Sequence, residues 1–190
     1  MAAQAGRYHR DEVAARALEL LDQLGLPDLT MRRLGAELGV QPSALYHHFR
    51  DKQTLLAAAA DTLLARLAPA PAGPWEDAVV AVCGDLREVL LSVRDGAELA
   101  ATVWSFGLGA AAPYDLLLAR LKDGGLGALA PVATRTLLHF VYGHAVDEQT
   151  RLQAAEAGAI EDAGLREPAD FDTGLGIVVA GIGLARAVRS

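Results

Sequence analysis

Apolar positions recur with a helical period along almost the whole chain. In residues 10–24 the apolar side chains fall on one wide stripe, and most of the charged ones fall on the other face. No segment shows the strict alternation of a half-buried strand. The pattern therefore predicts an all-α fold. The predicted helices cover residues 10–24, 31–38, 42–49, 52–68, 75–93, a weaker segment up to 104, 114–121, 131–155 and 171–188.

Several of the predicted helix ends carry capping residues. Gly25 and Gly39 follow the first two helices, where a C-terminal cap favours glycine. Thr30 and Asp51 precede the second and fourth helices, and their side-chain oxygens suit an N-cap. Residues 158–170 are polar and are predicted to form a loop.

The chain has 190 residues, a length that suits one or two domains. Residues 69–74, Pro-Ala-Pro-Ala-Gly-Pro, form its one proline-rich linker. We therefore expect one domain at 1–56, a connecting helix at 52–68, and a second domain at 69–190.

Composition narrows the class of protein further. Apolar residues make up 52% of the chain, which is enough for a sizeable core. The longest uncharged stretches, 99–114 and 173–185, are shorter than a membrane-spanning helix needs and contain glycines. The first 13 residues lack the apolar core of a secretory signal. The single cysteine, Cys83, excludes an intrachain disulfide and fits a reducing cytoplasm. We expect a cytoplasmic protein with no membrane partner.

The net charge of −7 is unevenly distributed. Residues 1–56 hold seven Lys/Arg and seven Asp/Glu, whereas residues 57–190 hold ten and seventeen. Within residues 29–56, four basic residues face two acidic ones. A locally basic segment on an acidic chain is compatible with local binding to DNA.

The first three predicted helices have the spacing of a helix-turn-helix unit, with Gly39 at its left-handed turn. Its expected core is Leu34, Leu38, Val40, Leu45 and Phe49. Groups that read base edges or contact phosphates are left on the other faces. These are Arg32, Arg33, Gln41, Ser43, Ala44, Tyr46, His47 and His48, with helix N-termini at Thr30 and Ser43 as further phosphate sites.

The literal residues strengthen this interpretation. Leu-Thr-Met-Arg-Arg-Leu-Gly-Ala-Glu-Leu-Gly-Val at 29–40, Ala-Leu-Tyr-His-His-Phe at 44–49 and Lys-Gln-Thr-Leu-Leu at 52–56 resemble the DNA-binding domain of the TetR family of transcriptional regulators. The resemblance implies a base contact for Arg32 and a variable base contact for His47. It further implies that Gln41, Pro42, Ser43 and Ala44 begin the recognition helix, and that Tyr46, His48 and Lys52 contact phosphates.

The C-terminal part is similar to the tetracycline repressors of that family, with counterparts of 75–77, 91–97, 139–140 and 171–182 in order. The resemblance also exposes departures from their ligand site. Ala100 stands at the position of the metal-binding histidine, Trp104 at that of an arginine, and Ala68 at that of a drug-contacting histidine, while Asp147 keeps the carboxylate of the metal shell.

A small-molecule cavity that is mostly apolar with a few polar points is expected in this domain. Its predicted lining is Leu99, Trp104, Phe106, Tyr114, His139, Tyr142 and Asp147. Plain core packing is an alternative for Trp104 and Phe106, and a hydrogen-bonded core position is one for His139. His144 and Glu148 are interpreted as a solvent-exposed pair, and neither a metal nor a cofactor is expected.

The last helix contains glycines seven residues apart, at 174/181 and 176/183. Glycine disfavours a helix, so this smooth stripe needs a structural reason such as a close helix approach. Members of the family dimerise through their last helices, and packing inside one subunit is the alternative. The predicted homodimer contacts are Gly174, Ile177, Val178, Gly181 and Ile182.

These features predict a ligand-responsive transcriptional regulator, not an enzyme. We expect a homodimeric repressor that leaves a palindromic operator when a small, apolar effector binds. One alternative is a small helical enzyme that uses His139 or His144 with Asp147 or Glu148 as acid and base. Another is a helical dimer whose DNA-binding head has lost its function.

Overall fold

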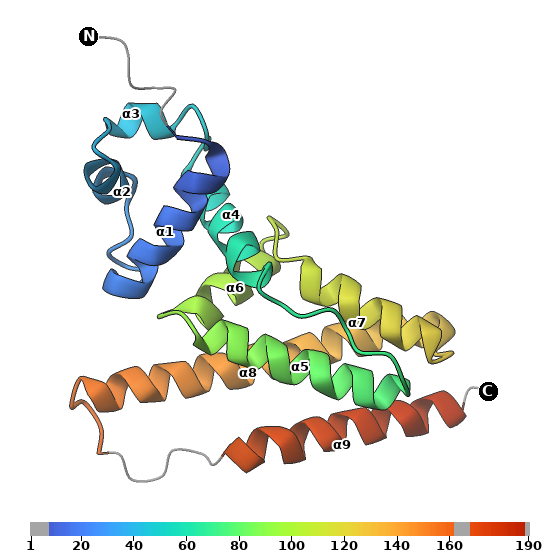
Figure 1. Cartoon of the computed structure of the whole chain (residues 1–190). Coiled ribbons are helices and arrows are strands. Elements are labelled where there is room, and N and C mark those ends of the chain that lie inside the picture. The colour runs from blue at the N-terminus through green and yellow to red at the C-terminus, as the bar shows by residue number, and fades with distance from the viewer. Residues whose placement is uncertain (1–7, 162–167, 189–190) are drawn as a thin grey trace. The chain divides into compact units, whose positions relative to one another are not determined.

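The computed structural model describes residues 8–161 and 168–188. Every regular element in these residues is a helix (Figure 1), which confirms the all-α prediction. No helix in the described part of the chain has the length and apolarity that crossing a bilayer requires.

The chain divides into two compact units. Of the described residues, the first contains 8–66 and 90–111, and the second contains 67–89, 112–161 and 168–188. Residues 90–111, which follow the proline-rich linker, thus group with the N-terminal helices.

The first unit is built around α4 (Lys52–Leu64), which packs against α1 (Arg10–Leu24) on one side and α6 (Gly96–Ser105) on another. The apolar stripe predicted for α1 is buried, as are eight residues of α4. Full burial of each leucine contributes roughly 1.5–3 kcal/mol. The alanines of α4 keep its surface small, so neighbouring helices can approach it closely.

The helix-turn-helix consists of α2 (Met31–Leu38) and α3 (Pro42–Leu45). Gly39 adopts the predicted left-handed conformation, with φ 65° and ψ 30°. A Cβ on Gly35 would lie 3.0 Å from the carbonyl oxygen of Val40, so the turn passes close over α2. The predicted core is confirmed for four residues and is only half-buried at Val40.

Two helices end four residues earlier than the sequence pattern predicted. The helix expected at 42–49 ends at Leu45, because the N–H groups of His47 and His48 donate to carbonyls three residues back instead of four. The helix expected at 52–68 ends at Leu64, several residues before the linker prolines.

The second unit contains α5 (Trp75–Leu91, whose last two residues belong to the first unit), α7 (Ala112–Asp123), α8 (Ala130–Glu156) and α9 (Pro168–Ala187). A short 3-10 turn, η1 (Gly127–Leu129), precedes α8. α8 packs against both α7 and α9. One face of α9 is buried, through Phe171, Leu175, Val179 and Ile182. Of the loop predicted at 158–170, residues 162–167 lie outside the described residues, and α9 already begins at Pro168.

Candidate nucleic-acid interface and effector region

Both predicted N-caps form and set the beginnings of α2 and α4. These helices, α3 and the residues that flank them carry the side chains predicted to contact DNA, which are called the reading surface below. The Thr30 hydroxyl oxygen accepts a hydrogen bond from the Arg33 N–H at 3.1 Å. Asp51 Oδ1 accepts one from the Thr54 N–H and another from the Thr54 hydroxyl, both at 2.8 Å. The Thr54 backbone N–H, then its hydroxyl, then the Arg50 guanidinium lower the pKa of Asp51.

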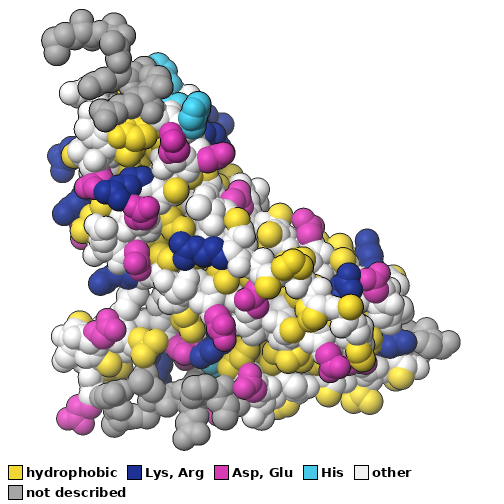
Figure 2. All heavy atoms as spheres, viewed as in Figure 1, with side chains coloured by type: hydrophobic (Ala, Val, Ile, Leu, Met, Phe, Trp, Pro, Cys, Tyr) yellow, Lys and Arg dark blue, Asp and Glu magenta, His cyan; other side chains and the backbone are white. Residues whose placement is uncertain are grey.

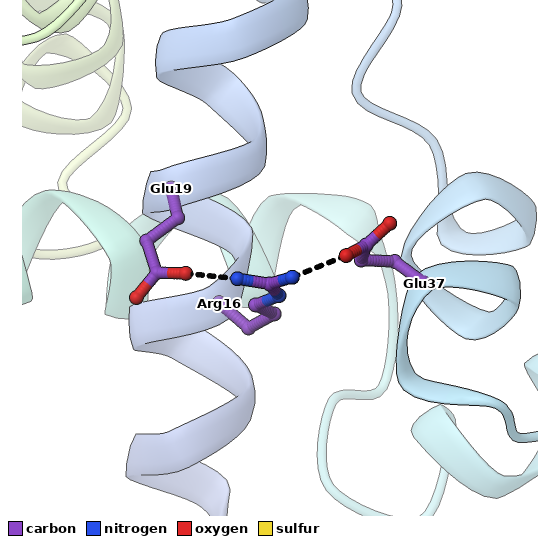
Figure 3. Close-up of polar contacts among 3 residues, drawn as sticks. All are labelled: Arg16, Glu19 and Glu37. Carbon is purple, nitrogen blue, oxygen red and sulfur yellow. Dashed lines mark hydrogen bonds and ion pairs between the residues drawn. The ribbon is translucent and has the colours of Figure 1, made fainter.

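An ion-pair network joins α1 to α2, and the sequence did not predict it. The Arg16 guanidinium on α1 donates to Glu19 of the same helix and to Glu37 on α2 (Figure 3). Hydrogen bonds to Glu19 and Glu37 raise the pKa of Arg16. The Glu37 side chain is therefore held against α1, and the contact helps to position α2.

The side chains predicted to contact DNA are mostly open to solvent. The exposed ones are Thr30, Arg32, Arg33, Gln41, Ser43, Tyr46 and His47, and the half-buried ones are Pro42, Ala44, His48 and Lys52. In Figure 2, histidine side chains gather with Lys and Arg at the end of the unit that holds α3.

The cations in this surface differ in how they are engaged. Arg33 lies 4.0 Å from Asp28, whereas neither Arg32 nor Lys52 forms an ion pair within the described residues. A surface that combines such cations with hydroxyl, amide and imidazole groups can neutralise phosphates and hydrogen-bond base edges.

The end of α1 is joined to the turn before α6 by two backbone-to-carboxylate hydrogen bonds. Asp22 Oδ1 accepts from the Arg94 N–H at 2.9 Å, and Asp95 Oδ2 accepts from the Leu26 N–H at 2.7 Å. Gly25 is needed at this joint, since its φ is 82° and a Cβ there would lie 2.9 Å from Asp95 Oδ2. The pairs are about 70 residues apart in sequence, so helical periodicity could not reveal them.

The predicted effector residues are divided between the units. Leu99, Trp104 and Phe106 belong to the first, where Leu99 is buried, Trp104 is half-buried and Phe106 is 60% exposed. Tyr114, His139, Tyr142 and Asp147 belong to the second, where Tyr114 and Asp147 are half-buried. The sequence alone gave no reason to separate the two groups.

The α8 members of this set differ from one another in burial. His139 lies on an exposed face of α8, which is not the hydrogen-bonded core position considered from sequence. Tyr142 is buried, and burial raises the pKa of its hydroxyl. That hydroxyl has no hydrogen-bond partner among the described residues. Buried polar atoms are usually paired, so this hydroxyl is an exception among the described residues.

His144 and Glu148 are not the solvent-exposed pair that the sequence suggested. Glu148 forms a two-pronged ion pair with Arg87 of α5, at 2.9 Å to Nε and 2.5 Å to Nη2, and both side chains are more than three-quarters buried. The Arg87 guanidinium also lies over the Phe171 ring at 5.2 Å. The interpretation was wrong because the partner of Glu148 lies 61 residues away in sequence.

The last helix presents two different faces. Gly174 packs inside the unit, where an added Cβ would lie 2.9 Å from the Phe140 ring, and Ile182 is buried. An added Cβ on Gly181 meets nothing within 4 Å. The exposed apolar residues beside Gly181 are Ile177, Leu184 and Val188, at 70%, 71% and 87% exposure. Of the predicted dimer contacts, Gly174 and Ile182 thus have partners within the protomer.

The sequence matches two family models. One, described as bacterial regulatory proteins of the tetR family, covers residues 14–59, and the other, described as a tetracyclin repressor-like C-terminal domain, covers residues 68–169. These are models of transcriptional regulators, so the enzyme alternative based on His139 or His144 is not supported.

Individual proteins are similar over nearly the whole length. The class A tetracycline repressor of transposon 1721 from Escherichia coli is 32% identical over 93% of this chain and 91% of its own. BioQ of Mycobacterium smegmatis is 37% identical with a TM-score of 0.82, covering 93% of this chain and 98% of that one.

Two further matches are complexes with ligands of different kinds. BioQ with its double-stranded DNA operator is 35% identical with a TM-score of 0.75, covering 93% and 98% of the two chains. A TetR variant of Acinetobacter baumannii with minocycline is 28% identical with a TM-score of 0.76, covering 95% and 99%. The architecture, the exposed reading surface and these matches agree: the chain belongs to the TetR family of ligand-responsive, DNA-binding transcriptional regulators.

Proposed function

We propose that the chain is a cytoplasmic homodimeric repressor that binds a palindromic operator and releases it when a small, largely apolar molecule binds. The observation that carries the DNA half of this proposal is the exposed helix-turn-helix surface, in which neither Arg32 nor Lys52 forms an ion pair with another described residue. BioQ, which shares more than a third of its residues with this chain, has been crystallised with its operator.

Different side chains of the reading surface have different tasks in this proposal. Arg32 reads a base edge, and Gln41, Ser43 and Ala44 let the start of α3 approach the major groove. Tyr46, His48 and Lys52, with Arg33 and the helix start at Thr30, contact phosphates, and His47 reaches bases. Phosphate contacts fix the register, whereas base contacts select the sequence.

The palindrome follows from a second copy of the chain. The exposed apolar face of α9, with Gly181 at its centre, suits an isologous contact in which the same surface of each copy takes part. Val178, which is half-buried, lies at the edge of this face. A two-fold dimer presents two identical reading surfaces to two identical half-sites.

In this proposal, residues 90–111 couple effector binding to the position of the DNA-binding helices. They fall within the C-terminal family match, yet they pack in the same compact unit as the reading helices. Within that unit, Asp22 and Asp95 tie α1 to the turn before α6. An effector that contacts Leu99, Trp104 or Phe106 and prefers one arrangement of α6 therefore shifts the reading helices by its difference in affinity for the two arrangements.

The effector chemistry differs from that of a magnesium–tetracycline sensor. Ala100 offers no ligand where the resemblance places the metal-binding histidine, and Asp147 alone is a weak contact for a hard cation. Trp104 replaces a fixed charge with a large apolar surface. We propose an aromatic or hydrophobic effector that is bound without a metal and oriented by the Tyr142 hydroxyl. Tyr114, His139 and Asp147 remain predicted contacts.

The test is release of an operator duplex, taken from upstream of the chain's own gene, by different small molecules. Apolar aromatic compounds should release the duplex without magnesium, and Tyr142→Phe should weaken the response to those that carry a hydrogen-bond acceptor. Tetracycline should have no effect with or without magnesium. Magnesium-dependent release by micromolar tetracycline would overturn the proposed effector class.

A further inference from the structure

Arg10, the first residue of α1, covers the segment that connects α3 to α4. Its guanidinium carbon lies 4.9 Å from the centre of the Phe49 ring. Phe49 is fully buried, and its backbone N–H donates to the Leu45 carbonyl at 3.0 Å, which closes the turn after α3. The start of α1 is therefore joined to the end of the reading surface through one aromatic ring. The two residues are 39 positions apart in the chain, so helical periodicity could not reveal this contact.

The contact with Phe49 leaves the Arg10 guanidinium able to bind an anion. A guanidinium that lies over an aromatic ring uses its flat face, whereas its N–H donors lie in its plane and point away from the ring. The Arg10 side chain is exposed, and it forms no ion pair with another described residue. Its charge is thus held in one place and is open to a partner from solution.

The acidic residues that neighbour Arg10 or Phe49 in sequence are engaged by other groups or face away. Asp51 is the only acidic residue between positions 38 and 60. Both of its oxygens accept hydrogen bonds, from the first turn of α4 and from Arg50. On α1, Glu12 Oε2 accepts the backbone N–H of the N-cap residue at 2.6 Å. Asp11 follows Arg10 directly, a spacing at which helical side chains do not face each other.

The chain on both sides of Phe49 carries the predicted phosphate contacts. His48 precedes Phe49 and Lys52 lies three residues after it, so the Cα atoms of Phe49 and Lys52 are at most about 11 Å apart. Between them, the Arg50 side chain is 86% exposed. Arg10 therefore extends a strip of basic side chains with a contribution from α1, a helix that was not expected to reach DNA.

We propose that Arg10 is a further DNA contact of this chain, which binds a backbone phosphate beside those bound by His48 and Lys52. The inference rests on the proposed function, because it assigns Arg10 to the same partner. A phosphate can accept two N–H groups of one guanidinium at once. Because Phe49 restrains the side chain before DNA arrives, less freedom is lost on binding. Phosphates carry no sequence information, so Arg10 contributes affinity and not sequence preference.

Two variants separate the charge of Arg10 from its packing on Phe49. In Arg10→Met the new side chain still covers the ring but has no charge, whereas Arg10→Lys keeps the charge and loses the planar fork. Arg66→Met is the matched control, since Arg66 is an exposed arginine of the same unit that lies beyond the C-terminal end of α4. Each variant is measured as the full-length protein, and thermal unfolding shows whether it is folded.

The measured quantity is the salt dependence of DNA affinity, which a purely structural role would not change. Fluorescence anisotropy is recorded with a duplex from upstream of the chain's own gene and with an unrelated duplex of equal length. Arg10→Met should lower the slope of log K against log salt by about 0.9 per head, or about 1.8 per dimer. Its loss of affinity relative to the parent should therefore shrink roughly tenfold between about 50 and 200 mM salt, equally on both duplexes. Arg10→Lys should keep most of the slope, and Arg66→Met should keep all of it.

The outcomes distinguish this inference from the proposed function. Equal slopes for Arg10→Met and Arg66→Met, with a parent protein that binds DNA, would overturn the assignment of Arg10 and leave the proposed function intact. A changed preference between the two duplexes would also overturn it, because Arg10 would then contact a base. A parent protein that binds neither duplex at low salt would overturn the proposed function, and this inference with it.

Discussion

The reading surface around α2 and α3 and the outer face of α9 are both exposed, but they expose opposite chemistry. The first presents cations, hydroxyls and imidazoles above a core of buried leucines and Phe49. The second presents Ile177, Leu184 and Val188 in a stripe without charge. A polar surface is stable in water until DNA replaces the water, whereas an apolar stripe of this kind indicates a protein partner. This contrast supports the proposal that the first surface binds DNA and the second binds another copy of the chain.

The largest effect is expected from adding a side chain at Gly181 or Gly174, the two glycines of α9 that lie seven residues apart. Gly181→Leu should leave the protomer folded, since a Cβ there meets nothing, and should dissociate the dimer. Overpacking costs about 1–3 kcal/mol per site, which two-fold symmetry doubles to about 2–6 kcal/mol per dimer. Light scattering measures the mass, and operator affinity should fall with it.

Gly174→Leu is the matched control, because its new side chain would meet Phe140 inside the unit. It should lower the free energy of unfolding by about 1–3 kcal/mol instead. Equal effects of the two substitutions on unfolding, with the dimer intact in both, would place the whole stripe inside the subunit.

A second prediction concerns the ion pair between Arg87 and Glu148, which stabilises the second unit from within. Glu148→Ala leaves the mostly buried Arg87 guanidinium without its partner and should lower the free energy of unfolding by about 3 kcal/mol. Glu156→Ala, at the exposed end of the same helix, should change it little. Urea denaturation measures both. Replacing the pair together, as Arg87→Met with Glu148→Leu, should restore most of the loss, and failure to do so would mean that the charges matter for another reason.

Arg32 and Lys52 should separate sequence reading from charge neutralisation. Arg32→Ala should reduce the preference for operator over unrelated duplex by about 1–3 kcal/mol, the value of one good base contact. Lys52→Ala should weaken binding to every duplex alike and lower the salt dependence by about one phosphate. Fluorescence anisotropy with both duplexes measures this. A uniform loss with Arg32→Ala would move that residue to the backbone.

The smallest effect is expected at the cap of α2. Thr30→Ala removes the acceptor for the Arg33 N–H and should cost about 1 kcal/mol of stability. Thr30→Ser keeps that acceptor and should restore most of it. Thermal unfolding of the three proteins checks the order. If the alanine variant is as stable as the parent, the hydrogen bond contributes nothing measurable.

What the sequence predicts depends on how far apart the interacting residues are. Gly39, Thr30 and Asp51 act on their own helix ends, and each has the predicted cap geometry. Other contacts join residues that are far apart in sequence. The Arg16–Glu37 ion pair spans 21 positions and the Arg87–Glu148 ion pair spans 61. A periodic pattern carries no information about such partners. Periodicity could also not distinguish Gly174 from Gly181, because which side of α9 is covered depends on α8.

The central claim is that the exposed helix-turn-helix grips DNA phosphates and selects a sequence. It is tested most directly by measuring the affinity for duplexes from upstream of the chain's own gene as a function of salt. If each head neutralises about three or four phosphates, log K should fall with log salt at about −0.9 per phosphate, or roughly −5 to −7 for a dimer, with one duplex clearly preferred. Absence of binding to any of these duplexes at low salt would contradict the account.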